Sequence, residues 1–170
     1  MALLSIVKYP DPRLEESTQS VELFDQALRA LAEDMIETMH AAPGIGLAAP
    51  QIGRSERITV VDLSAGSDPN ELLVLVNPVV VTENGSVKED EGCLSFPDLT
   101  LIVPRPEQVV VEAQNLDGVR FSIEAEDLLA RCLHHEIDHL DGVLFLQRVS
   151  PLKRDLARRK IQKKIRAGEW

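Results

Sequence analysis

Residues 124–142 read EAEDLLARCLHHEIDHLDG, and this stretch decides the fold. Acidic residues stand at its beginning and Gly142 follows its end, as is typical of helix boundaries. Its apolar set is Leu128, Leu129, Cys132 and Leu133. These side chains fall on one face at helical spacing, so we predict a half-buried helix.

The same helix contains His135 and His139, four residues apart, with Glu136 between them. Two imidazoles at this spacing project from one helix face and can chelate a cation, while the glutamate can take a proton from metal-bound water. Neutral imidazoles suit zinc or ferrous iron. Because three of the chain's four histidines fall within residues 134–139, we favour a metal site over a chance match on a polar helix.

A catalytic metal usually has three protein ligands and an open position. His40 lies at a helix end and is most simply a favourable charge or a surface residue. Cys132 shares the helix face with His135, and we interpret it as packing beside the site. Cys93 stands in EGCLSFP, a turn bounded by glycine and proline that can aim a side chain inward, so Cys93 is the better third ligand.

Outward from this helix, the pattern predicts an α+β fold in which strands are bracketed by helices. Apolar residues at steps of three and four predict a helix over residues 25–42, and a segment broken by glycine follows at 44–53. Strands are expected at 57–63, 72–82, 101–103, 108–115 and 119–123, the last two joined by a hairpin turn. A third helix from residue 150 would place Leu152, Leu156, Ile161 and Ile165 on one side.

Length and composition limit the class of protein. The chain has 170 residues, 44% of them hydrophobic and 27% charged, which fits one soluble globular domain spanning 1–170. We find no apolar stretch long enough for a membrane span and no signal peptide, so we expect a cytoplasmic protein. Two cysteines need not form a disulfide there.

The charge is unevenly distributed. Residues 151–170 hold eight basic and two acidic residues, which gives this segment a net charge of +6. Since the whole chain has a net charge of −10, the first 150 residues carry −16. This acidity argues against DNA binding by the whole surface, because phosphate binding needs clustered cations. The basic end of the chain is expected to have a partner of its own.

Three segments, GIGLAAPQIG (44–53), EGCLSFP (91–97) and HHEIDHLDG (134–142), closely resemble the three signature motifs of peptide deformylases. The resemblance extends to PDPRL near the beginning and SPLKRD near the end. It implies a hydrolase that removes the N-formyl group from the initiator methionine of nascent polypeptides and releases formate. It also implies mostly antiparallel sheets around a central HExxH helix, with a C-terminal helix.

Carried over by position, the resemblance makes Cys93, His135 and His139 the metal ligands and Glu136 the catalytic carboxylate. It implies Fe²⁺ as the usual metal, with Ni²⁺, Co²⁺ or Zn²⁺ as replacements, although the ligand set alone also suits zinc. The side-chain amide of Gln51 and the backbone N–H of Leu94 would stabilise the developing oxyanion.

The resemblance also marks a substrate site. The residues expected to bind substrate are Gly44, Ile45, Gly46, Glu91, Gly92, Leu128, Cys132 and His135. Gly46 is also expected among the catalytic residues, and His135 among the metal ligands. The segment 44–46 would bind the peptide as an added strand. Helix geometry puts Leu128, Cys132 and His135 on one stripe, which would line a methionine-sized pocket with Ile45 opposite. A plain loop at 44–53 and core packing of Leu128 are the alternatives.

Two positions depart from the commonest family pattern. His134 stands where glutamine is frequent, and Thr100 where a basic residue is frequent. His134 lies off the ligand face, so we expect a neighbour of the site and not a fourth ligand. Asp138 belongs to the motif but is not a ligand, and we expect it to form a structural ion pair, with Arg105 as the candidate partner.

Other functions stay open from the residues alone. A zinc metallopeptidase that cuts internal peptide bonds would share the HExxH chemistry, and a non-catalytic module would enclose a structural metal with four protein ligands. The basic tail is either a contact to ribosomal RNA, as the resemblance suggests, or a solvated helix face.

Overall fold

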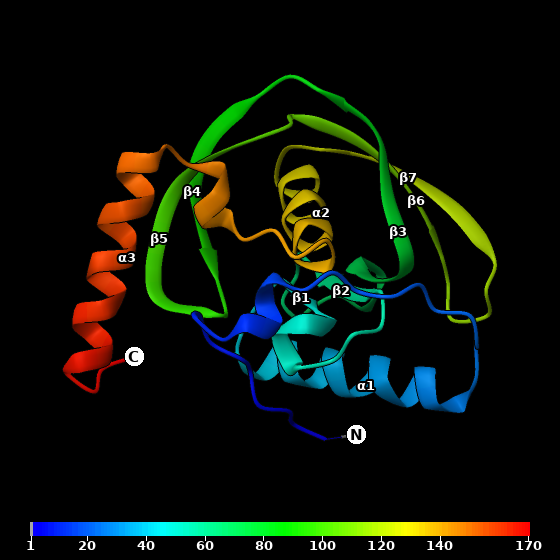
Figure 1. Cartoon of the computed structure of the whole chain (residues 1–170). Helices are drawn as coiled ribbons and strands as arrows, with labels where there is room; N and C mark the ends of the chain where they lie inside the picture. Colours follow the sequence, from blue (N-terminus) through cyan, green and yellow to red (C-terminus); the bar gives the residue numbers. More distant parts are fainter. Residues whose placement is uncertain (1) are drawn as a thin grey trace.

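The computed structural model describes residues 2–170 (Figure 1). Its α-helices are α1 (Gln26–Ala41), α2 (Asp127–Leu140) and α3 (Pro151–Arg166). Its strands are β1 (Gly46–Ala48), β2 (Ile58–Asp62), β3 (Leu72–Asn84), β4 (Val87–Cys93), β5 (Phe96–Arg105), β6 (Gln108–Gln114) and β7 (Arg120–Glu126). No helix within residues 2–170 is both long enough and apolar enough to cross a membrane.

The strands form two antiparallel sheets. Within the described residues, one sheet has the order β1-β2-β3-β6-β7 and the other pairs β4 with β5. Figure 1 shows α2 in the middle of the molecule, between β4 and β5 on one side and the larger sheet on the other. The predicted α+β class, with a central HExxH helix and a C-terminal helix, is confirmed.

Helix α1 follows the expected pattern closely. The Asp25 carboxylate accepts a hydrogen bond from the Leu28 N–H and caps the first turn. The apolar residues of the expected stripe are buried, namely Leu28, Leu31, Met35 and Met39. Burial of each such side chain stabilises the fold by about 1.5–3 kcal/mol. The helix ends at Ala41, just before the proline and glycine that lead into β1.

Helix α2 is shorter and more deeply buried than its sequence suggests. Glu124 and Glu126 pair with β6 as part of β7, so the helix begins at Asp127 and not at residue 124. All residues from 130 to 140 are buried, including Glu136 and Asp138, because the two sheets cover opposite sides of the helix. The expectation of a half-buried helix was therefore wrong.

The segment around Cys93 is a β-hairpin and not an open turn. Cys93 is the last residue of β4 and pairs with Phe96, so the turn consists of Leu94 and Ser95 alone. The whole of β4 escaped prediction because its sequence, VKEDEGC, has four charged residues in succession and no apolar alternation. Placement at a strand end fixes the direction of the cysteine side chain.

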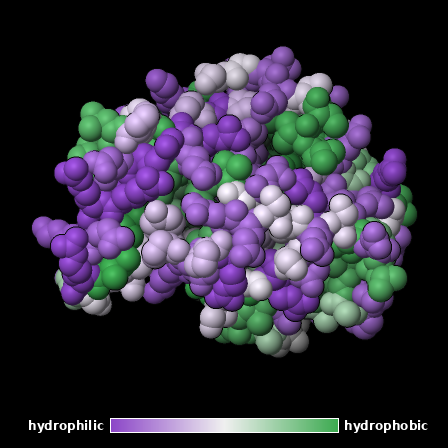
Figure 2. All heavy atoms as spheres, viewed as in Figure 1, coloured by the Kyte–Doolittle hydropathy of each residue, from purple (hydrophilic) through white to green (hydrophobic). Residues whose placement is uncertain are grey.

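Helix α3 exists as expected, but its apolar residues lie differently. Ile161 is buried together with Ala157, whereas Leu152 is 69% exposed and Leu156 57% exposed. Ile165 is exposed as well, so Ile161 is the one member of the predicted apolar side that is buried. The helix lies along the outside of β5 and is covered on one narrow face only (Figure 1). In Figure 2 this region is mostly hydrophilic, with apolar residues interspersed.

Candidate metal centre and substrate pocket

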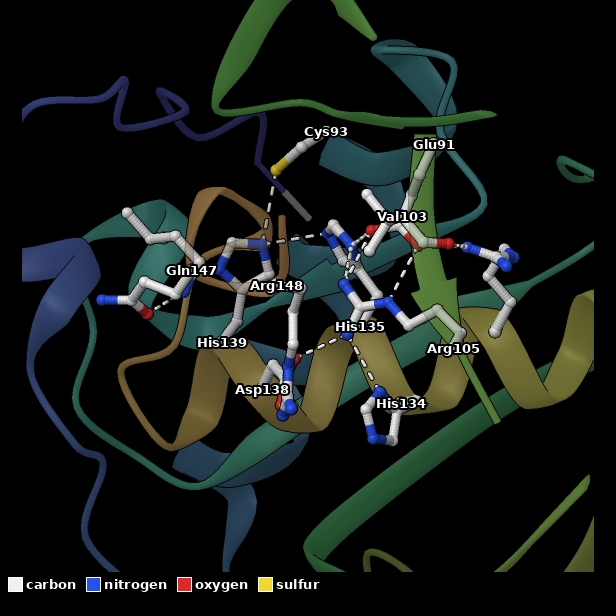
Figure 3. Close-up of polar contacts among 12 residues, drawn as sticks. Glu91, Cys93, Val103, Arg105, His134, His135, Asp138, His139, Gln147 and Arg148 are labelled. Carbon is white, nitrogen blue, oxygen red and sulfur yellow. Dashed lines mark hydrogen bonds and ion pairs between the residues drawn. The ribbon is translucent and has the colours of Figure 1, made fainter. Parts of the chain in front are cut away.

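Three possible metal ligands from two elements converge inside the molecule. The His139 Nε2 atom lies 3.1 Å from His135 Nε2 and 3.3 Å from Cys93 Sγ. Within residues 2–170, these three residues form the one group of histidine, cysteine and acidic side chains close enough to share an ion. Figure 3 shows the side chains pointing toward a common point.

This donor set fits a metal ion. Metal–nitrogen distances of about 2.0–2.1 Å and metal–sulfur distances of about 2.3 Å place tetrahedral ligands roughly 3.3–3.7 Å apart. The observed separations of 3.1 and 3.3 Å are near that range. Helical spacing brings the two imidazoles together, and the end of β4 brings the thiol to them from the opposite wall.

A buried acid orients His135. The Nδ1–H of His135 donates to Glu91 Oε2 at 2.6 Å, which directs Nε2 toward the ligand point. Arg105 donates two hydrogen bonds to the same carboxylate, from Nε to Oε1 at 3.0 Å and from Nη2 to Oε2 at 2.7 Å. Burial alone would raise the pKa of Glu91, but the hydrogen bonds from His135 and Arg105 lower that pKa well below its usual value. Glu91 therefore stays ionised.

Sequence reasoning missed Arg131, which also holds Glu91. Its Nη1 donates to Glu91 Oε1 at 3.0 Å, and its guanidinium also donates to the backbone carbonyls of Val87 and Val103. The signal was present in the helix, because residue 131 precedes His135 by four positions and so shares its face. An arginine on the ligand face of the helix indicates that hydrogen-bond acceptors face it.

The expected ion pair between Asp138 and Arg105 is present, with 2.5 Å between Oδ2 and Nη1. Asp138 also accepts two hydrogen bonds from Arg148, at 2.6 and 2.9 Å. His134 points away from the ligand atoms, as expected, and contacts Arg105 (Figure 3). Burial lowers the pKa of His134, the Arg105 charge lowers it further, and the Asp138 charge opposes this.

Glu136 is a buried carboxyl group beside the ligand atoms. Its Oε1 atom has no hydrogen-bond partner among residues 2–170. Burial raises the pKa of Glu136 to about 7, and the charge of Glu91 adds to this effect. Gly46 lies so close that a β-carbon there would stand 2.9 Å from the carboxyl carbon of Glu136. Only glycine leaves the carboxyl group room at this position.

Gln51 lies on the other side of Cys93. Its Nε2 amide is 3.6 Å from Cys93 Sγ and 3.2 Å from Ser95 Oγ, and its Oε1 accepts a hydrogen bond from Ala48 N–H. The amide group is therefore held with its donor end at the ligand atoms. Leu94 packs against Gly44, where a β-carbon would meet the Leu94 side chain at 2.7 Å.

A pocket of about 440 Å³ leads from the surface to this centre. The expected site residues that line it are Gly44, Ile45, Gly46, Gln51, Glu91, Gly92, Cys93, Leu94, Leu128, Cys132, His135 and Glu136. His139 is absent from the lining and lies behind the other ligands. The volume is in the range of small-molecule sites.

The apolar side of the pocket agrees with the sequence reasoning. Cys132 is buried with its thiol 3.7 Å from the Ile45 carbonyl, and burial raises the pKa of that thiol, so it stays protonated and packs beside the site. Leu128 is half exposed at the mouth. Strand β1 is an edge strand that pairs with β2 on one side, so its other side can accept an extended peptide.

Three ligands, a neighbouring carboxyl group and an open pocket are the arrangement expected of a single-metal hydrolase. Comparison with known proteins also indicates a metal-dependent hydrolase. Residues 3–155 match the family model for polypeptide deformylase. A peptide deformylase from Acidobacterium capsulatum is 55% identical over 170 residues, covering 100% of both chains.

Solved structures agree as well. The crystal structure of a peptide deformylase from Legionella pneumophila has a TM-score of 0.91 and 47% identity, covering 98% of each chain. A peptide deformylase from Ehrlichia chaffeensis in complex with actinonin has a TM-score of 0.87 and 42% identity, covering 96% of this chain and 98% of the other. The chain therefore belongs to the polypeptide deformylase family and is a metal-dependent hydrolase, which confirms the resemblance seen in the sequence motifs.

Proposed function

We propose that this enzyme removes the N-formyl group from the initiator methionine of nascent polypeptides and releases formate. The observation that carries this proposal is the Glu136 carboxyl group, buried beside the convergent Cys93, His135 and His139 at the inner end of a pocket bordered by an edge strand. The names of the related proteins support the same reaction.

In this proposal Cys93, His135 and His139 would hold one Fe²⁺, which Ni²⁺, Co²⁺ or Zn²⁺ could replace. When bound, the cation supplies Lewis acidity and lowers the pKa of the attacking water. The Cys93 thiolate adds negative charge, which makes the site a milder Lewis acid than one with three neutral ligands. Glu91 keeps His135 in the tautomer that presents Nε2.

Glu136 is the proposed proton carrier. It takes a proton from the attacking water and later delivers it to the departing amine of methionine. Burial raises the pKa of Glu136, which makes its carboxylate a stronger base than that of an exposed glutamate. Gly46, packed against this carboxyl group, keeps it in place.

Gln51 and Leu94 are proposed to stabilise the oxyanion. The amide of Gln51 is held by the Ala48 N–H with its donor end toward Cys93. The backbone N–H of Leu94 belongs to the residue directly after Cys93. Loss of one such donor typically lowers kcat by about 10²–10³-fold.

The substrate is proposed to bind along β1. Residues 44–46 would pair with the peptide backbone, and Glu91 and Gly92 would border it from the opposite wall. The methionine side chain would enter the apolar part of the pocket, lined by Leu128, Cys132 and His135.

We further propose that residues 1–170 act as one catalytic domain in the cytoplasm, without membrane or DNA partners, and that α3 contacts the ribosome. Exposed basic residues on α3 support that contact. Replacement of Lys160 and Lys163 by glutamate is expected to weaken ribosome binding and reduce its salt dependence. Unchanged binding would contradict the ribosome contact alone.

The test of the function is formate release from formyl-Met-Ala-Ser by the iron or nickel form. We expect turnover by the wild type and a loss of about 10²–10⁴-fold in Glu136→Gln, with metal content unchanged. An N-acetylated peptide with an internal methionine controls for endopeptidase activity. Absence of formate release from the metal-loaded wild type would contradict the proposal.

A further inference from the structure

His134 occupies a place that the mechanism above does not use. The residue is buried on α2 beside His135, with its ring directed away from the ligand atoms (Figure 3). Its Nδ1 atom is 2.9 Å from Arg105 Nη1, and its Nε2 atom is 3.0 Å from Glu83 Oε2. Glu83 stands near the end of β3, with its side chain 50% exposed. The imidazole thus joins the larger sheet to an arginine of β5.

The direction of these hydrogen bonds follows from the chemistry of the partners. A guanidinium group only donates, so the Nδ1 atom of His134 accepts from Arg105. The ring proton is then on Nε2 and is donated to the Glu83 carboxylate. One tautomer satisfies both contacts, which gives His134 a single orientation.

Arg105 carries this constraint to the metal centre. Its side chain is 1% exposed, so its orientation depends on its hydrogen-bond partners. Through Nη1 it donates to His134 and Asp138, and through Nε and Nη2 it donates to Glu91, which in turn accepts from His135. Without the acceptor at residue 134, the planar guanidinium can rotate toward Asp138 and loosen its grip on Glu91.

We propose that His134, held by Glu83, is a positioning residue for the reaction. It orients Arg105, and through Arg105 and Glu91 it fixes the ring of the ligand His135. Loss of a supporting partner of a metal ligand typically lowers metal affinity or activity by about 10–100-fold. The activity part of this inference rests on the proposed function, whereas its effect on metal retention does not.

The experiment compares four variants loaded with Co²⁺. His134→Leu removes both contacts, whereas His134→Gln can accept from Arg105 through its oxygen and donate to Glu83 through its nitrogen. Glu83→Ala removes the outer partner at an exposed position that tolerates substitution. Glu124→Gln, an exposed glutamate on β7, controls for loss of one negative charge from the same sheet.

The readouts are the visible Co²⁺ spectrum, the rate of metal loss to a chelator, and kcat and KM on formyl-Met-Ala-Ser. We expect His134→Leu to lose metal about 10-fold faster, with a changed spectrum and a lower kcat at nearly constant KM. His134→Gln should restore wild-type values. Glu83→Ala should fall between them, since water can replace the exposed carboxylate, and Glu124→Gln should match the wild type.

Two results would overturn the inference. One is a wild-type spectrum and rate of metal loss in both His134→Leu and Glu83→Ala, which would leave His134 a purely structural role. The other is equal impairment of His134→Gln and His134→Leu, which would show that the two hydrogen bonds are not what matters. Metal effects as expected, together with no formate release by the wild type, would contradict the proposed function and support the positioning role.

Discussion

Helices α2 and α3 depart from the usual rule of burial in opposite directions. Helix α2 encloses charged Glu136 and Asp138, whereas α3 leaves apolar Leu152 and Leu156 exposed. Buried charges destabilise a fold unless they are paired, and Asp138 is paired with Arg105 and Arg148. Glu136 is different, because its Oε1 atom has no hydrogen-bond partner among residues 2–170 and burial raises its pKa. Position relative to the two sheets, and not residue hydropathy, therefore decides which helix face is covered.

The largest expected difference between the helices concerns their acid–arginine pairs. Asp138→Ala leaves Arg105 buried without its 2.5 Å partner and should lower the free energy of unfolding by about 3–5 kcal/mol. Asp155→Ala breaks only the exposed ion pair with Arg159 and should change the free energy of unfolding by less than about 1 kcal/mol. Urea denaturation at matched metal content measures both. Equal losses of unfolding free energy in the two variants would contradict this difference between the helices.

Truncation of apolar side chains sharpens the contrast within α3. Ile161→Ala empties a fully buried position and should cost about 2–5 kcal/mol. Leu156→Ala, at a position 57% exposed, should stay within about 0.5 kcal/mol. Thermal and urea unfolding of the two variants provide the test, and a larger loss from Leu156→Ala would show that the exposed face is covered in solution.

An added methyl group tests how closely β1 packs against α2 at Glu136. Gly46→Ala would place a β-carbon 2.9 Å from the Glu136 carboxyl carbon, and displacement of that group should lower kcat/KM by about 100-fold. In Gly168→Ala, just beyond α3, the added β-carbon meets no atom within 4 Å, so activity should stay unchanged. The positive φ of 71° at this position should lower the free energy of unfolding by about 1–2 kcal/mol. Steady-state assays decide this, and an active Gly46→Ala enzyme would contradict the close packing.

A buried acid away from both helices has a smaller, pH-dependent effect. Asp62 accepts hydrogen bonds from Ser64, His40 and the Gly66 N–H, and those from Ser64 and then His40 lower the pKa of Asp62 although burial opposes them. Its stabilisation is therefore complete above pH 4 and is lost as the pH falls through the lowered pKa. Asp62→Asn should lower the free energy of unfolding by about 1–3 kcal/mol at pH 7 and by less at pH 3. Urea unfolding at both values tests the sign, and a gap that widens at pH 3 would contradict it.

The sequence predicted the parts of the fold that depend on local periodicity. The spacing of His135 and His139 follows from helix geometry, and the apolar stripe of α1 has a single face. The local pattern did not predict β4 because charged residues occupy both of its sides, including the buried Glu91. It also could not place His40, whose partner Asp62 comes from a neighbouring strand. Contacts between distant segments decide such cases.

The candidate site shows the same division. Motif spacing led to Cys93, His135, Glu136 and His139. The sequence did not show that Glu91, held by arginines, supports His135, because Glu91 was expected only in the substrate site. Their burial follows from the way β4 and β5 cover α2. Support for a ligand comes from tertiary structure, so it is the part of a metal site that local sequence reveals least.

The most direct test of the central claim is anaerobic metal analysis combined with formate release on the same samples. We predict one metal ion per wild-type chain together with turnover of formyl-Met-Ala-Ser, and loss of both in His139→Ala. Wild-type turnover without stoichiometric metal, or full metal content and activity in His139→Ala, would contradict the proposed centre of Cys93, His135 and His139.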